Sequence, residues 1–152
     1  MKLKLTNTII KKYVKAARKN KLIWGVDESK SKMIIVEPVS AIIVDYDTAI
    51  ESFLFTLSTP REYQPIYDML FYYRKNESSE VFSYFDFKEY KNSLCKLDDV
   101  HVFDKRLFQQ FRAGKYFYTI AEMGQNIHCA YIYESALHDE FHLCGLIMGC
   151  RV

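Results

Sequence analysis

The sequence predicts an α+β fold, with a mostly antiparallel sheet and three to four helices. Turn-forming residues separate short runs of β-branched and aromatic residues, which indicates consecutive strands. Capping residues precede apolar stripes of helical period, which indicates amphipathic helices. The chain has 152 residues, of which 49% are hydrophobic. That length suffices for one hydrophobic core, so we expect a single compact domain over residues 1–152.

The N-terminal stretch predicts a short strand followed by a basic helix. "KLKL" at 2–5 alternates charged and apolar residues, and the next three residues are competent N-caps. A helix is expected from Thr8 to Asn20. Its two faces separate completely in projection, with Ile9, Ile10, Tyr13, Val14, Ala16 and Ala17 on one side and Lys11, Lys12, Lys15, Arg18 and Lys19 on the other.

The next stretch predicts strands and then a well-capped helix. A hairpin is expected over 21–38, turning at "DESKSK", and further strands over 39–46 and 51–58. Thr59 is the expected N-cap of a helix from Pro60 to Lys75. Proline is favoured at the first helical position, and an acidic residue three positions after the cap completes a capping box.

The second half of the chain predicts two more helices among four strands. A strand over 81–85 leads into a helix over 86–97, which Asp86 caps. A short helix is expected after Asp104, ending near Gly114. Three closing strands are expected over 115–123, 126–134 and 141–152, the first two joined by a turn at "GQN".

Positive charge is concentrated at the N-terminal end. The chain carries a formal net charge of +2, but residues 1–26 hold eight Lys and Arg and no Asp or Glu. The remaining residues therefore carry −6, the difference between +2 and +8. Such asymmetry favours a polyanion or an acidic partner at this end.

The cationic face of the 8–20 helix is typical of a surface that contacts phosphates. Five cations on one face predict duplex DNA binding whose log affinity falls with log salt at a slope of about −4.5. No side chains suited to reading bases accompany them, so binding would be independent of sequence. The alternative is a solvated lysine face that serves solubility.

Catalytic signatures of the common kinds are absent. The sequence contains no GxGxxG, GxxxxGK, GxSxG or CxxC pattern, which argues against a mainstream enzyme, and we expect no cofactor. His101 and His128 are interpreted as core or surface residues. An alternative metal site, and with it a metal-dependent enzyme, would use His138, His142, Cys144 and Cys150.

The four cysteines and the length of the apolar runs indicate the cellular compartment of the protein. Cysteine spacings match no disulfide or paired-ligand pattern, so free, partly buried thiols are expected. No apolar run is long enough to span a membrane, and the first residues do not have the pattern of a signal peptide. We expect a cytoplasmic protein, in the host cytoplasm if a phage encodes it.

The order of these features resembles one domain of the bacterial β-type DNA sliding clamps. The features are a strand into a basic helix, a hairpin with further strands, and "FDFKEYKNSLCKL" leading to strands that close on "GLIMGCRV". The resemblance covers about two thirds of the chain. It implies a non-catalytic role in DNA replication or repair and a processivity fold whose helices face DNA. One such domain could encircle DNA only as a ring of several copies.

The resemblance also implies two sets of site residues. The DNA-facing set adds two lysines of the 86–97 helix to the basic helix: Lys11, Lys12, Lys15, Arg18, Lys19, Lys88 and Lys91. In the clamps the terminal strand borders a groove that receives short peptides of client proteins. The residues that would border it here are Ile147, Met148, Arg151 and Val152.

An interaction protein is the alternative to DNA binding. A compact chain rich in tyrosine, without catalytic motifs, also suits a small phage or mobile-element protein that inhibits a host machine by protein–protein binding. The binding surface would then be an aromatic patch drawn from Tyr63, Tyr67, Tyr72, Tyr73, Tyr116, Tyr118, Tyr131 and Tyr133.

Overall fold

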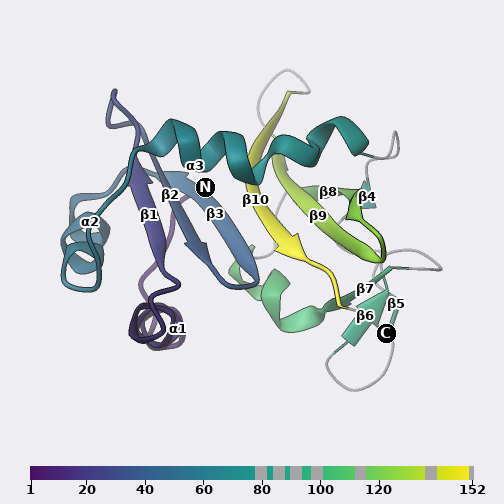
Figure 1. Cartoon of the computed structure of the whole chain (residues 1–152), viewed down its shortest axis with the longest axis horizontal. Helices are drawn as coiled ribbons and strands as arrows, with labels where there is room; N and C mark the ends of the chain where they lie inside the picture. Colours follow the sequence, from purple (N-terminus) through teal and green to yellow (C-terminus); the bar gives the residue numbers. More distant parts are fainter. Residues whose placement is uncertain are drawn as a thin grey trace. The chain divides into compact units, whose positions relative to one another are not determined.

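The fold class is α+β, as predicted, with helices and antiparallel strands (Figure 1). The structure is a computed structural model that describes residues 1–77, 82–83, 88–89, 94–96, 101–111, 116–135 and 140–150. The chain divides into two compact units, Met1–Phe71 and Tyr72–Val152. The expected single domain stays a prediction.

The first unit contains three helices and one antiparallel three-stranded arrangement. Its strands pair in the order β1, β2, β3, with Trp24 opposite Ile35 and Ile35 opposite Ile42. The elements are α1 (Asn7–Arg18), β1 (Ile23–Val26), β2 (Lys32–Glu37), β3 (Ser40–Asp45), α2 (Thr48–Phe55) and α3 (Tyr63–Leu70).

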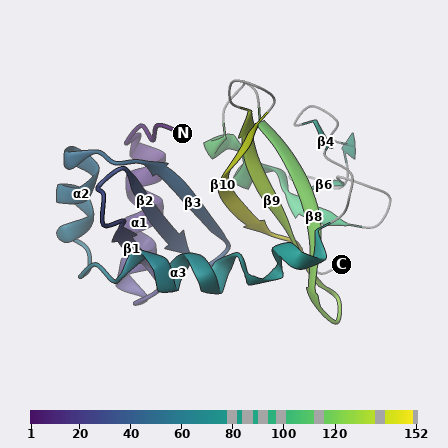
Figure 2. The same cartoon turned by 90° about the horizontal axis from the view of Figure 1, so that it is seen from above.

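Helices cover both faces of these three strands. The Trp24 ring packs edge-on against Phe55 of α2, with ring centroids 4.9 Å apart. Successive residues of a strand point to opposite faces, so the neighbouring Gly25 lies on the other face. There a Cβ atom would lie 2.4 Å from the Arg61 carbonyl oxygen and 3.3 Å from Ile66 of α3, which explains the glycine. Figure 1 shows α3 and α1 on opposite sides of the strands, and in Figure 2 the fainter α1 lies behind them.

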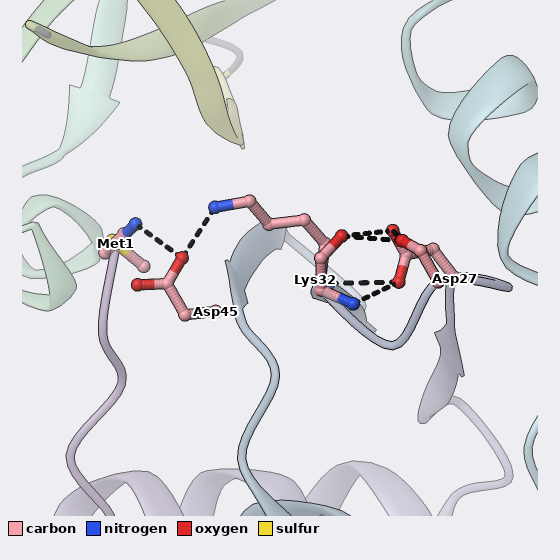
Figure 3. Close-up of polar contacts among 6 residues, drawn as sticks. Met1, Asp27, Lys32 and Asp45 are labelled. Atoms are coloured by element: carbon pink, nitrogen blue, oxygen red, sulfur yellow. Dashed lines mark hydrogen bonds and ion pairs between the residues drawn. The ribbon is translucent and has the colours of Figure 1, made fainter.

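Polar contacts fix the ends of the β2–β3 hairpin and the turn before it (Figure 3). The Asp27 carboxylate accepts hydrogen bonds from the backbone N–H groups of Ser31 at 2.8 Å and Lys32 at 3.0 Å. Burial alone would raise the pKa of Asp27, but these bonds outweigh it and hold the pKa below its usual value. Asp45 pairs with Lys32 Nζ at 2.5 Å and with the Met1 amine at 3.7 Å.

Two expected strands of the first unit are wrong. Residues 2–5 form no regular element, although the Met1 carbonyl accepts a hydrogen bond from the Asp45 N–H at 2.7 Å. The stretch 51–58 is helical through Phe55, because α2 begins after Asp47. The Asp47 carboxylate caps the helix by accepting from the N–H groups of Ala49 and Ile50. Ile50 and Leu54, which are four positions apart and so lie on the same face of the helix, are both buried.

The helix expected from Pro60 begins later and ends earlier. The Arg61 N–H donates to the Trp24 carbonyl at 2.8 Å, which keeps this segment extended along β1. Helix α3 therefore starts at Tyr63 without a side-chain cap, and the Thr59 capping box is wrong. A separate 3₁₀ helix, η1 (Tyr72–Asn76), follows at the start of the second unit.

The second unit is built from antiparallel strands with short 3₁₀ helices. β10, β9, β8 and β4 pair in that order, and β5, β6 and β7 form a separate small sheet. The elements after η1 are β4 (Phe82–Ser83), β5 (Lys88–Glu89), β6 (Leu94–Lys96), β7 (Val102–Asp104), η2 (Lys105–Gln110), β8 (Tyr116–Gly124), β9 (Ile127–Ser135) and β10 (Phe141–Met148). The three closing strands and the turn that joins the first two are confirmed.

The helix predicted over 86–97 is wrong where the structure describes it. Lys88 and Glu89 of β5 pair with Lys96 and Cys95 of β6. The rest of that stretch, including the expected cap Asp86, lies outside the described residues. Asp104 does cap a helix by accepting from the Arg106 N–H at 3.0 Å, but the helix is of the 3₁₀ type.

The cores of the two units hold the largest apolar side chains. Trp24, Ile35 and Leu54 are fully buried in the first unit, and Phe103, Tyr118 and Tyr131 in the second. Among the described residues, no helix is both long and apolar enough to cross a membrane.

Candidate nucleic-acid interface

Helix α1 forms because local signals and tertiary burial agree. Thr6 is the N-cap, and its hydroxyl accepts from the Ile9 N–H at 3.3 Å. On the inner face Tyr13 and Ala16 are buried. Two cations, Lys15 and Arg18, lie in the last turn, where they interact favourably with the helix dipole. The predicted helix is thus confirmed, with ends within two residues of those expected.

The outer face of α1 presents four exposed cations. Lys11, Lys15, Arg18 and Lys19 are all exposed, and none of them forms an ion pair with a carboxylate in the described part of the chain. They extend over about 12 Å along the helix axis, at a rise of about 1.5 Å per residue. We call these four residues the basic face. Its charges are free to interact with an external polyanion.

The fifth predicted cation, Lys12, is not part of the basic face. It is half-buried, and its Nζ atom lies 3.4 Å from Glu37 Oε1 and 3.3 Å from Ser40 Oγ. Glu37 and Ser40 are register partners at the end of the β2–β3 hairpin. The separation of charged and apolar faces in projection could not show this contact, because the carboxylate comes from a strand 25 positions along the chain.

Of the two lysines expected on the 86–97 helix, the structure describes one, and that one is not on a helix. Lys88 belongs to strand β5, and Lys91 lies outside the described residues. The expectation that a second helix adds cations to the basic face therefore loses its structural basis.

The predicted client groove at the end of the chain is described only in part. Ile147 is fully buried in β10, and Met148 is half-buried. Arg151 and Val152 lie outside the described residues. The strand predicted at this end is confirmed through Met148, and Cys150 adds one bridge to Val102.

The alternative metal ligands are not brought together where the structure describes them. His142 is exposed and lies 3.7 Å from Glu140, whereas Cys144 is buried and Cys150 half-buried. His138 lies outside the described residues. No group of three His, Cys, Asp or Glu side chains among the described residues is arranged to hold a metal ion.

The two histidines interpreted singly from the sequence are neighbours. The rings of His101 and His128 lie 4.6 Å apart, centroid to centroid. His128 Nε2 lies 3.1 Å from the Val102 carbonyl oxygen, and His101 Nε2 lies 2.7 Å from Glu122 Oε1. Position along the chain gave no signal of this pair, because His101 comes before β7 whereas His128 lies in β9, 27 positions later.

A second polar cluster anchors η1 to the strands of its unit. The Glu77 carboxylate accepts hydrogen bonds from the hydroxyls of Tyr133 and Thr119 and from Arg74 Nε, all between 2.6 and 2.9 Å. Burial and this carboxylate raise the pKa of Tyr133 well above its usual value. Because three donor groups already satisfy the two oxygens of Glu77, the cluster is suited to holding structure.

Three of the eight tyrosines expected in the aromatic patch of the alternative interaction protein are wrong. Tyr118, Tyr131 and Tyr133 are buried, so they belong to the core of the second unit. Tyr63 and Tyr67 stack on each other along α3 and are half-buried. Of the tyrosines proposed for the patch, Tyr72 is the one that is strongly exposed among the described residues.

Comparisons with known proteins do not assign the chain to a family. No protein-family model, curated protein or solved structure matches it.

Proposed function

We propose that the protein binds duplex DNA without sequence preference, through phosphates that contact the basic face of α1. The observation that carries this proposal is the exposure of Lys11, Lys15, Arg18 and Lys19 on one helix face with no carboxylate of the described residues paired to them. Phosphate contacts of this kind supply affinity and position, but they do not read bases.

The rigidity of α1 supports binding to a regular polyanion. Tyr13 and Ala16 are buried in the first unit, so the helix is held in place before it meets a ligand. The same burial disfavours a membrane surface as the ligand, since an interfacial helix inserts its apolar face into lipid. Aromatic side chains, on which the bases of single strands stack, are missing from the basic face.

Salt dependence is the direct test of this function. Four phosphate contacts give a slope of log affinity against log salt of about −3.6 on a random-sequence duplex. This slope is less steep than five contacts would give. We expect the double substitution Lys15→Glu and Arg18→Glu to abolish most binding at 0.1 M salt while the circular dichroism spectrum stays unchanged. Fluorescence anisotropy of a labelled duplex measures the affinities.

A matched control separates the basic face from total charge. Lys30 is an exposed lysine in the turn between β1 and β2 of the same unit. Lys30→Glu changes the net charge as much as either single substitution, Lys15→Glu or Arg18→Glu, and we expect it to leave the salt slope at its wild-type value, whereas each of those two should make it less steep. Wild-type affinity in the Lys15→Glu and Arg18→Glu variant, or a salt-independent affinity, would contradict the proposal.

Participation in replication or repair as a clamp-like ring is a further part of the proposal, supported by the sequence resemblance alone. Two features of that resemblance, the strand at 2–5 and the helix over 86–97, have been corrected above. A ring requires several copies of this chain. Light scattering in the presence and absence of duplex DNA tests it: a monomer that binds no DNA would instead favour an interaction protein.

A further inference from the structure

We propose that Glu37 acts as a built-in counter-ion that withholds Lys12 from phosphates and so limits the basic face to four contacts. This inference rests on the proposed DNA binding by α1. It assigns to Glu37, a residue of strand β2 that lies outside the basic face, control over the strength of binding.

The position of Glu37 allows it to compete effectively with an external phosphate for Lys12. Its side chain is 8% exposed, whereas that of Lys12 is 28% exposed. A carboxylate that is largely removed from water is costly to leave without a partner. If Lys12 turned outward to a phosphate, this carboxylate would lose its positively charged partner, so the internal ion pair at 3.4 Å is favoured over an external one.

Neighbouring groups keep the carboxylate in place. The Ser40 hydroxyl donates to Glu37 Oε1, and Lys12 Nζ lies 3.3 Å from the same hydroxyl oxygen. Tyr13, the next residue of α1, is 2% exposed, and burial together with the Glu37 charge raises the pKa of its hydroxyl well above the usual value. A negative charge at Glu37 is therefore felt by the inner side of α1.

Lys12 is well placed to become a fifth contact once Glu37 is neutral. In projection it lies at the edge of the basic face, about 20° from Lys19 and about 60° from Lys15, at about 100° per residue. The lysine side chain is a flexible four-carbon chain, so its ammonium group turns readily toward a new partner. Neutralising Glu37 also removes a negative charge from beneath the helix, and this too strengthens binding to phosphates.

The test is the salt dependence of duplex binding by Glu37→Gln. We expect its slope to steepen from about −3.6 to about −4.5, and its affinity at 0.1 M salt to rise about eightfold, the gain from releasing about 0.9 of a counterion per added contact. A purely structural role for Glu37 predicts the opposite, because loss of the Lys12 ion pair would loosen α1 and weaken binding.

Two further variants show whether Lys12 causes the gain in affinity. The double variant Lys12→Gln and Glu37→Gln should return to a slope of about −3.6, because the added contact comes from Lys12. Glu28→Gln, an exposed carboxylate of the same unit, removes the same charge and should keep the wild-type slope.

The outcomes separate this inference from the proposed function. A wild-type slope near −3.6 with an unchanged or weaker Glu37→Gln overturns the inference and leaves DNA binding intact. A gain that persists in the double variant also overturns it. A wild-type protein that binds no duplex overturns both. Thermal unfolding of each variant shows that the compared proteins are folded.

Discussion

At the scale of single residues, close contacts made across the chain decide what each position tolerates. Gly149 follows β10, and a Cβ atom there would lie 2.0 Å from His128 Nε2. The Gly149 N–H donates to the His128 carbonyl at 2.9 Å, and the next N–H, of Cys150, donates to the Val102 carbonyl at 2.8 Å. His128 Nε2 reaches that same Val102 oxygen, so the ring has little room to move.

We expect Gly149→Ala to destabilise the protein by about 1–3 kcal/mol, the usual cost of overpacking a well-filled site. Urea unfolding measures the change. The double-mutant cycle with His128→Ala is the control, because the alanine at position 149 should cost much less once the ring is gone. Equal costs in both backgrounds would show that the ring does not set the requirement for glycine.

At the scale of elements, the sequence predicted best where all signals were local. For α1, the Thr6 cap, the apolar stripe and the basic stripe lie within one segment and agree, and the helix formed as expected. For α2, the apolar run "ESFLFTLS" fits a strand or a helix, and the Asp47 cap that decides between them precedes the run. For α3, the start is set by the contact of Arg61 with β1, which local pattern does not contain.

The cap of α2 gives the prediction at this scale. Asp47 accepts from the N–H groups of Ala49 at 2.8 Å and Ile50 at 3.1 Å. We expect Asp47→Ala to lower the free energy of unfolding by about 1 kcal/mol, the typical cost of losing an N-cap. Asp47→Asn should be close to wild type, since asparagine caps as well as aspartate does. Equal losses in the two variants would mean that the charge, and not the cap, stabilises α2.

At the scale of the whole molecule, the sequence predicted the α+β class, the hairpin and the closing strands. It also predicted that the cations of α1 are exposed, which holds for four of the five. It did not predict which polar side chains meet. The Lys12–Glu37 pair, the His101–His128 pair and the Glu77 cluster each join residues from different elements. A single sequence reports periodicity and caps, but it does not report which strand lies beside which helix. The same limit applies to the tyrosines, several of which fill the core of the second unit.

The cysteines provide a prediction for the chain as a whole. None of the four forms a disulfide, and Cys95, Cys129 and Cys144 are buried whereas Cys150 is half-buried. Burial raises the pKa of Cys129 to about 12, and burial together with the Asp104 charge raises that of Cys150 above its usual value. Thiolates are the reactive form, so both shifts slow modification near neutral pH.

An aromatic disulfide reagent at pH 8 should therefore modify one thiol per native chain quickly and the other three only as the structure opens. The fast thiol is Cys150, and its rate should rise about tenfold per pH unit below its pKa, because a raised pKa leaves the thiolate scarce until the pH approaches it. Cys150→Ser should abolish the fast phase and leave the slow one, while urea should make all remaining thiols react at once. Because the three buried thiols lie in β6, β9 and β10, their rates would report how cooperatively these strands open. Two or more fast thiols in the native protein would mean that a strand placed here in the core is open to solvent.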